Sequence, residues 1–428
     1  MAANTLKGQV KTPFGRLTSG IMFGYACMFV GLMTPATLLL TFKMMEIDPN
    51  GFTTSYGLVA GVGAFFALIG NPIGGAVSDR TNIAFGRRRT WILLGPLFGC
   101  AALLWIGMAS AVWQVLVGWC VAQLFFNFGM AAYTALIPDQ VPEEKRGTIS
   151  GLMGLALPIG IAVGMVLMMS MPNAASLTKW LLVSIIGFVG PVISLFIIRE
   201  GKIEIPSVKK EKVSVKEKMG KVYPSPRKYP EFTWALVSKF LLMLGYCSNL
   251  YLTVMFVDRL GLTQAEATQS VGTISIVGLA ATAIASILGG MLSDKVKKQK
   301  PFLYGCSVII LIGLFILAFV PTLTAVMIAG VILGIGLGAF SSVDMALVTR
   351  ILPNKEDAAK DFGLMNVANA LPQSIVPAIA PLLLGIGGWV FFFLSLSVCV
   401  VLAMFALRPL PEVGEYKDEI ITVLPEAK

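Results

Sequence analysis

Two charged residues, Lys239 and Asp344, fall inside long apolar stretches of the sequence. Lys239 is seven residues into its stretch, and Asp344 is six residues before Arg350 at the end of another. At a helical rise of 1.5 Å per residue, they lie about 10 Å and about 9 Å from a helix end. A charge in hydrocarbon costs roughly 2.5–3.5 kcal/mol on insertion scales. We therefore predict a Lys239–Asp344 ion pair that gates the inner side or, through Asp344, carries a proton. The alternative is that Lys239 reaches the lipid headgroups and Asp344 caps a helix or pairs with Arg350.

Amides and tyrosines form a second set of candidates within the apolar stretches. Gln123 and Asn127 are one helical turn apart on one face, and Tyr246 shares a face with Asn249. Each amide offers a donor and an acceptor, and each ring an apolar surface, which suits a hydroxyl-rich solute. The alternative for any one amide is a hydrogen bond between helices. The residues that we expect to line a binding cavity are Tyr25, Gln123, Asn127, Tyr246, Asn249, Asn369 and Gln373, with Asn366 on the same stripe as the last two.

The same inventory argues against several kinds of chemistry. The chain has no histidine, the usual proton shuttle and the commonest metal ligand. Its six cysteines lie in apolar runs without metal spacing, so we interpret them as small packing residues rather than disulfides. It has no paired carboxylates within the apolar runs and no Walker-type loop. We expect no metal, no cofactor and no enzymatic activity.

The elements that carry these residues are predicted from hydropathy. Of 428 residues, 56% are hydrophobic and 13% charged, and a soluble domain needs more polar surface. The chain's apolar residues are concentrated in runs of about 20 residues or more, and runs of that length are typical of membrane-spanning helices. We expect an all-α integral membrane protein with twelve transmembrane helices, at residues 17–42, 53–77, 90–109, 113–136, 148–171, 179–198, 232–257, 268–292, 302–321, 323–350, 360–386 and 387–407.

The distribution of basic residues predicts the orientation. If both termini and the loops after even-numbered spans share one side, that side holds 29 of the 33 lysines and arginines. The other side holds Lys43, Lys179 and Arg259. The positive-inside rule then places both termini in the cytoplasm, and we expect a multi-pass protein of the cell's plasma membrane. The net charge of +10 reflects this topology and contacts with anionic lipid rather than nucleic-acid binding.

Short sequences recur in the same order in the two parts of the chain. Gly74-Gly75 with Ser78-Asp79 returns 215 residues later as Gly289-Gly290 with Ser293-Asp294. Further matches join Gly24-Tyr25 to Gly245-Tyr246, Val141-Pro142 to Leu352-Pro353, Gly151-Leu152-Met153 to Gly363-Leu364-Met365, and Leu157-Pro158 to Leu371-Pro372. They predict two six-helix halves, 1–198 and 232–410, joined by a cytoplasmic linker, 199–231, and followed by a tail, 411–428. Parallel halves of this kind are typical of secondary transporters.

The turn after the second span has the densest group of charges. There Asp79 and Arg80 are followed by Phe85-Gly86 and by the three arginines 87–89. Asp79 can face the positive end of a neighbouring helix, and the arginines can pair with carboxylates and helix-end carbonyls. We expect a latch that holds one conformation, formed by Asp79, Arg80, Gly86, Arg87, Arg88 and Asp294. The alternative is that the arginines only enforce topology.

This turn closely resembles the conserved motif of the major facilitator superfamily. The spacing Ser-Asp-Arg, four residues, Phe-Gly-Arg-Arg-Arg is similar to the branch that holds sucrose–proton and glycoside–cation symporters, as is the end of the fourth span, Ala135-Leu-Ile-Pro-Asp139. The second-half copy keeps Asp294-Lys295 but has Lys297, Lys298 and Lys300 in place of Gly-Arg-Arg. The resemblance to the superfamily covers essentially the whole chain and implies a twelve-helix transporter fold.

One departure limits what the resemblance implies. Sucrose–proton symporters of this branch have an aspartate in the fourth span, four residues before an asparagine. With Asn127 on that asparagine, the aspartate position is Gln123, and an amide does not titrate. The resemblance therefore favours sugar-like recognition, while the proton site has to lie elsewhere, with Asp344 as the remaining candidate.

Repeat and resemblance together predict a secondary active transporter. We expect a monomer that moves a small solute, a sugar or glycoside, by alternating access with proton coupling. One alternative is an exporter of amphipathic compounds, which the 21 methionines and 26 phenylalanines would suit, although ordinary packing also explains them. Another is a membrane solute sensor, which would usually carry an added signalling domain.

Overall fold

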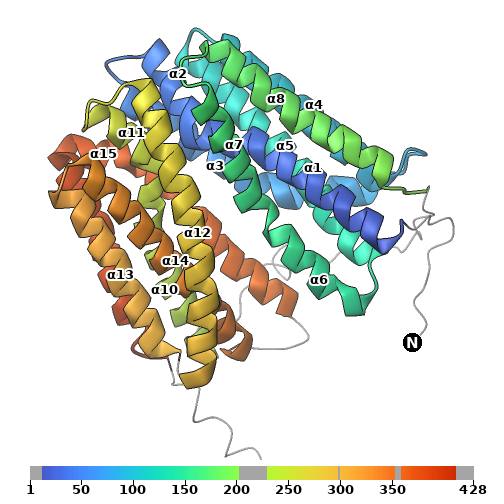
Figure 1. Ribbon diagram of the computed structural model, residues 1–428. Coiled ribbons are helices and arrows are strands. Elements are labelled where there is room, and N and C mark those ends of the chain that lie inside the picture. The colour runs from blue at the N-terminus through green and yellow to red at the C-terminus, as the bar shows by residue number, and fades with distance from the viewer. Residues whose placement is uncertain (1–11, 202–228, 297–298, 352–357, 411–428) are drawn as a thin grey trace, which may run out of the picture. The chain divides into compact units, whose positions relative to one another are not determined.

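The computed structural model describes residues 12–201, 229–296, 299–351 and 358–410 (Figure 1). Within these ranges every regular element is a helix, as predicted. An apolar segment in lipid has to satisfy its backbone polar groups internally, and helices do so within one segment. Most of the predicted linker and the whole predicted tail, residues 202–228 and 411–428, lie outside the described residues.

Six predicted spans of the first half are present as helices. Two of them are interrupted, because five residues of π-helix, η1, separate α1 from α2 and Leu155 separates α6 from α7. The elements are α1 (Phe14–Thr34), η1 (Pro35–Leu39), α2 (Leu40–Ile47), α3 (Phe52–Arg80), α4 (Arg87–Met108), α5 (Val112–Gln140), α6 (Glu143–Gly154), α7 (Ala156–Ser170) and α8 (Ser176–Ile197).

The second half begins with another interrupted span. Between α10 and α11 the chain tightens into a 3₁₀ turn, η2. The elements are α10 (Pro230–Tyr246), η2 (Cys247–Tyr251), α11 (Leu252–Asp258), α12 (Gln264–Val296), α13 (Lys300–Phe319), α14 (Leu323–Ile351) and α15 (Ala358–Ala406).

The last helical stretch accounts for two of the twelve predicted spans. Eleven segments of the described chain are long and apolar enough to cross a membrane, and the last has 43 residues, Leu364–Ala406. At 1.5 Å per residue it would be about 65 Å long, roughly twice the 30 Å of a hydrocarbon core. Its backbone leaves helical geometry at Gly387 and Gly388, where the sequence predicts the boundary between spans eleven and twelve. The described chain therefore contains twelve segments long and apolar enough to cross a membrane, as the sequence predicts.

Helix ends differ from the predicted ones by a few residues. α5 continues to Gln140, past the expected end at 136 and through Pro138. α2 likewise continues to Ile47, past 42. Hydropathy detects the apolar part of a helix, whereas these extensions are polar turns beyond it. The six cysteines are free, and four of them are buried.

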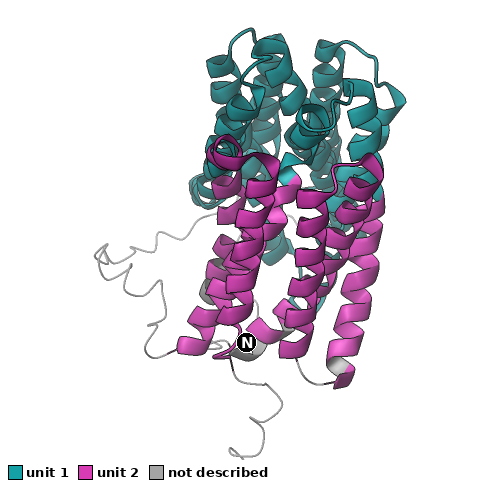
Figure 2. Cartoon of the chain, turned by 90° about the vertical axis from the view of Figure 1, so that its left-hand side faces the viewer, with its two compact units in different colours: residues 1–211, 250–276, 377–381 teal, residues 212–249, 277–376, 382–428 magenta. Residues whose placement is uncertain are grey.

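The described chain forms two compact units (Figure 2). The first contains residues 1–211 with 250–276 and 377–381, and the second contains 212–249, 277–376 and 382–428. Segment 250–276 joins the first unit through hydrogen bonds such as Tyr56 Oη to the Leu250 carbonyl, 2.9 Å. The halves and linker delimited at 198, 231 and 410 stay a prediction from the sequence repeat.

Glycines matched by the repeat make matched contacts, each inside its own unit. A Cβ at Gly74 of α3 would lie 2.6 Å from the Cα of Phe128 in α5, and one at Gly289 of α12 would lie 3.0 Å from the Cα of Ala339 in α14. The two glycines are 215 residues apart, and their partners 211. Such close approach of helix backbones requires a residue without a side chain. The second and fourth helices of each half thus cross in the same way.

The break at Gly388 provides a test of the twelve-span fold. Its φ of 63° and ψ of −162° are strained for any residue with a Cβ, although a Cβ there would meet no atom within 4 Å. We expect Gly388→Ala to cost about 1–3 kcal/mol through backbone strain alone, seen as a lower melting temperature in detergent. Gly385→Ala is the matched control, because Gly385 also has open space but not the left-handed φ. Equal melting temperatures of the two variants would contradict the break.

Candidate functional site

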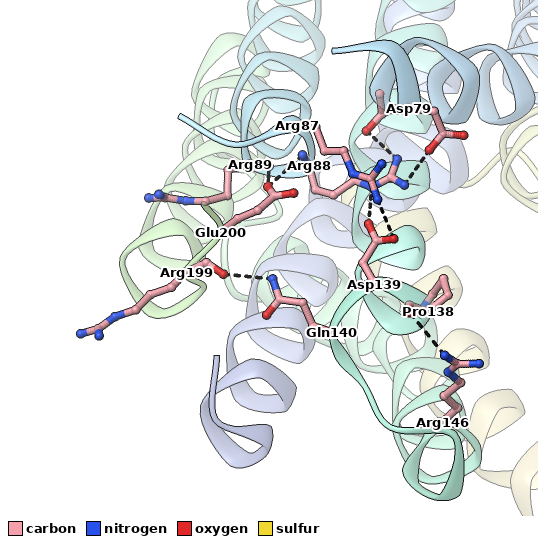
Figure 3. Close-up of polar contacts among 11 residues, drawn as sticks. Asp79, Arg87, Arg88, Arg89, Pro138, Asp139, Gln140, Arg146, Arg199 and Glu200 are labelled. Atoms are coloured by element: carbon pink, nitrogen blue, oxygen red, sulfur yellow. Dashed lines mark hydrogen bonds and ion pairs between the residues drawn. The ribbon is translucent and has the colours of Figure 1, made fainter. Parts of the chain in front are cut away.

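Three arginines open helix α4, which is an unfavourable place for cations. The unpaired N–H groups of a helix N-terminus carry about half a positive charge, so basic side chains there need compensation. Arg87, Arg88 and Arg89 occupy the first turn of α4, and Gly86 precedes it. The compensation comes from carboxylates on three other parts of the first unit (Figure 3).

Asp139, in the last turn of α5, binds two of these arginines. Its Oδ1 accepts a hydrogen bond from Arg87 Nη2 and its Oδ2 one from Arg88 Nε, both at 2.8 Å. Arg88 also donates through Nη2 to Asp79 Oδ1 at 2.6 Å and through Nη1 to Ser78 Oγ at 2.9 Å. Arg88 therefore ties the ends of α3, α4 and α5 together.

The two aspartates are not equivalent. The Asp139 side chain is 15% exposed, whereas that of Asp79 is 62% exposed. A solvent-exposed ion pair contributes about 0–1 kcal/mol, but a buried charge that loses its partner costs several kcal/mol. Asp139 is therefore the main anchor of Arg88, and Asp79 adds a weaker contact.

Glu200 closes the N-terminus of α4 from a different part of the sequence. Its Oε2 accepts hydrogen bonds from the backbone N–H groups of Arg88, 2.9 Å, and Arg89, 3.0 Å. Gly86 has a φ of 109°, and a Cβ there would lie 2.6 Å from this oxygen. Both the backbone angle and the space for the carboxylate therefore require glycine.

Burial raises the pKa of the Glu200 carboxyl, against the opposing effect of these two backbone N–H groups and of the Arg87 and Arg88 charges. Next to it, the Arg199 carbonyl accepts hydrogen bonds from Gln140 Nε2 and Thr12 Oγ1, each 3.0 Å. The segment that follows α8 is thereby fixed to the ends of α4 and α5 and to residue 12.

The structure places Asp79, Gly86, Arg87 and Arg88 of the predicted latch in one contact network with Asp139 and Glu200, and the latch itself stays a prediction. Arg80 is exposed and forms no ion pair with the described residues. The side chain of Asp294 lies outside the described residues.

Asp139 and Glu200 are the two partners that the sequence prediction did not identify. Asp139 belongs to the motif that ends the fourth span, and Glu200 is a carboxylate beside Arg199 at the start of a basic loop. Both are distant in sequence from the arginines. Only the packing of α4 against α5 and α8 brings them together.

The predicted Lys239–Asp344 pair forms within the second unit. Lys239 Nζ of α10 lies 2.7 Å from Asp344 Oδ2 of α14, and each side chain is 10% exposed. The two residues, which the sequence predicts at similar depths in their helices, therefore contact each other. At this burial the pair is energetically asymmetric, because removing one partner leaves the other charge buried and alone.

The first-half candidates for solute binding lie on α1 and α5. The Tyr25 ring packs edge-on against Phe29 and Tyr133, with centroids 4.9 and 5.7 Å apart. Asn127 Nδ2 donates to the backbone carbonyl of Gln123 at 2.8 Å, so one of its donors is used inside its own helix. Among the described residues, no side chain or backbone group hydrogen-bonds the Gln123 side chain, which is 8% exposed.

The second-half candidates lie on α10, η2 and α15. Tyr246 is the last residue of α10, and Asn249 lies three residues further on, in η2. Asn249 and Gln373 are exposed and Asn369 half-buried, with Asn369 and Gln373 one turn apart on one face of α15. An amide exposed to hydrocarbon would be costly, so this face is suited to an aqueous cavity.

Each unit by itself contains amides and tyrosines that can bind hydroxyls, and the second unit also contains the buried Lys239–Asp344 pair. The helical backbone is interrupted at η1 and η2. Local π and 3₁₀ segments free backbone groups for other partners and often mark functional positions. No group of three or more histidine, cysteine, aspartate or glutamate residues in the described chain could hold a metal ion.

Comparison with known proteins relates this arrangement to one family. The model of the Major Facilitator Superfamily matches residues 18–326 and 267–421. A D-xylose transporter of Levilactobacillus brevis is 28% identical over 173 residues, which cover 40% of this chain and 34% of that protein. The matches span about a third or less of the length of the first curated relatives.

Two further similarities cover most of the chain. A multi-drug resistance efflux pump PmrA homolog of Lactococcus lactis subsp. lactis (strain IL1403) is 25% identical over 380 residues, 84% of this chain and 86% of that protein. The crystal structure of a D-xylose-proton symporter superposes with a TM-score of 0.65 at 13% identity, covering 93% of this chain and 97% of that one. The latter shows a shared fold.

The unequal burial of the two aspartates gives a direct test of the arginine network. Asp139→Asn leaves Arg87 and Arg88 without a full countercharge, and we expect a loss of about 3 kcal/mol in the free energy of unfolding. Asp79→Asn, the matched control, should cost less than about 1 kcal/mol. SDS-induced unfolding in mixed micelles measures both. A larger loss for Asp79→Asn would overturn the assignment of Asp139 as the anchor.

Proposed function

The chain belongs to the Major Facilitator Superfamily, and from this premise we propose that it is a secondary active transporter that moves a small hydroxyl-rich solute, a sugar or glycoside, by alternating access. The observation that carries the proposal is the buried pair of Lys239 and Asp344. Asp344 is a titratable group inside a membrane-spanning helix. A charge at such a position is costly, so it is usually paired or required for function.

Protonation of Asp344 would couple a proton to movement of the protein. A neutral Asp344 no longer balances Lys239, so the packing of α10 against α14 would lose its main electrostatic contact. A conformation in which Lys239 finds water or another partner would then be favoured. A ligand shifts such an equilibrium only by its difference in affinity between the two conformations, and the proton has that difference here.

The proposed solute-binding residues are Tyr25, Gln123, Asn127, Tyr246, Asn249, Asn369 and Gln373. Gln123 supports this proposal most, because it is an amide in an apolar span whose side chain has no hydrogen-bond partner among the described residues. The sugar-transporting relative is consistent with a hydroxyl-rich solute. Asn127 contributes less, since it is already partly used by its own helix.

We propose the arginine network as the conformational latch. In this account Arg88 joins α3, α4 and α5 in one state through Asp79 and Asp139, and Glu200 joins the segment after α8 to them. Helix ends fixed in this way move as one body. The distribution of basic residues supports cytoplasmic termini, and a location in the plasma membrane is part of the same proposal.

Export of amphipathic compounds is the second candidate. It is favoured by the similarity to an efflux pump homolog over 84% of the chain. The two candidates differ in the solute, while both use a gradient. A membrane solute sensor would bind a solute without moving it.

The test is uptake of labelled D-xylose and of a panel of other sugars into proteoliposomes with and without an inward proton gradient. We expect accumulation that depends on the gradient. Lys239→Gln with Asp344→Asn removes the pair without leaving an orphan charge, and it should lose accumulation against a gradient but keep solute exchange. Asp48→Asn, which changes an acid on the turn between α2 and α3, is the control.

Each other outcome decides between the candidates. Accumulation by the doubly neutral variant at the wild-type level would exclude the pair as the coupling site. Gradient-driven movement of a cationic dye without any sugar flux would favour the exporter. Binding of a solute without flux in any gradient would favour the sensor.

A further inference from the structure

An apolar groove lies between α12, α13 and α14 in the second unit. Its volume is about 530 Å³, and its lining is almost entirely carbon. Leu288 and Leu292 of α12 form one wall, and Phe302 and Cys306 of α13 form another. Leu288 and Leu292 are themselves highly exposed, so the groove opens on the surface of the helices and not inside the unit.

Small residues make the groove deep. Ala285 and Gly289 on α12, Gly305 on α13 and Ala339 on α14 all contribute to its lining. A Cβ at Gly305 would meet no atom within 4 Å, whereas Gly289 already touches Ala339. The floor is therefore formed by close helix contact, and the space above it is left open along the helix axis.

One end of the groove is basic. Leu292 is one turn before Lys295, and Pro301 directly follows Lys300, so both lysines stand beside the last lining residues. Lys295 is exposed. Lys300 Nζ donates to the carbonyl of Arg408 at 2.8 Å, which brings a third cationic residue to this end.

These lysines differ from their counterparts in the first half. There Arg87 and Arg88 form ion pairs with Asp139 and Asp79. Lys295 and Lys300 form no ion pair with any residue that the structure describes in the second unit. Among the described residues, no carboxylate compensates the charge of these two lysines.

We infer that this groove binds an anionic phospholipid, with one acyl chain along α12 and α13 and the phosphate at Lys295 and Lys300. The combination argues for a lipid, because the apolar lining suits an acyl chain and the basic end suits an anionic headgroup. A neutral apolar solute would gain nothing from the lysines. Anionic lipids attract basic residues near the membrane surface by about 1 kcal/mol each, which is a roughly five-fold change in binding.

The first unit provides a natural control. A second apolar groove, of about 320 Å³, lies between α3 and α5 and is lined by residues such as Phe66, Cys120 and Leu124. No lysine or arginine occurs within three positions of any of these three residues in the sequence. It should accept acyl chains without regard to headgroup charge.

The experiment uses the whole chain in phosphatidylcholine vesicles with a tryptophan reporter in each groove. Phe302→Trp reports on the basic groove and Phe66→Trp on the control groove. The fluorescence of the seven native tryptophans is measured on the parent protein and subtracted from that of each variant. Brominated phosphatidylglycerol or brominated phosphatidylcholine is added as quencher. We expect at least about five-fold preference for phosphatidylglycerol at position 302 and none at position 66.

Neutralising the lysines completes the test. In the Phe302→Trp background, Lys295→Gln with Lys300→Gln should lower the preference to that of the control groove, while quenching by phosphatidylcholine persists. Equal preference at positions 302 and 66, or a preference that survives loss of both lysines, would overturn the proposal. So would the absence of quenching by either lipid at position 302, which would indicate that a second copy or another protein covers the groove.

Discussion

A charge in a low-dielectric medium needs a countercharge, and the described parts of this protein are organised around that requirement. Lys239 and Asp344 meet it inside their helices with a single 2.7 Å contact. At the helix ends, where α4 starts with three arginines, Asp139 and Glu200 meet it by contacts to side chains and backbone. Without these carboxylates the N-terminus of α4 would combine a helix dipole and three cations of the same sign.

The two halves share the same helix crossings, but the charged turns that follow those crossings differ. Gly74 and Gly289 allow equivalent close contacts, so the repeated backbone arrangement is retained. The turn that follows has diverged: arginines held by aspartates in the first half, and lysines beside an apolar groove in the second. A duplicated fold can therefore keep its packing, which requires glycine at fixed points, while the charged turns acquire separate roles.

The sequence was sufficient for the helices, because hydropathy over some twenty residues is a strong signal in a membrane protein. It also suggested the Lys239–Asp344 pair from their matching depth, but left open headgroup contact for Lys239 and pairing with Arg350 for Asp344, and the packing of α10 against α14 decides for the pair. It was insufficient for Glu200 and for the importance of Asp139. Their partners are more than 50 residues away, and which carboxylate faces α4 depends on how α5 and α8 pack. Helix ends were also missed, because their polar last turns resemble loops.

The central claim is that charge compensation between α10 and α14 supports the structure and the proposed transport. A double-mutant cycle of melting temperatures tests it most directly, with Lys239→Asp, Asp344→Lys and the two together. Each single change places two like charges at one buried position, so each should lower the melting temperature strongly. The double change restores an ion pair and should recover most of the loss. A double variant that melts as low as the sum of the single losses predicts would contradict the account.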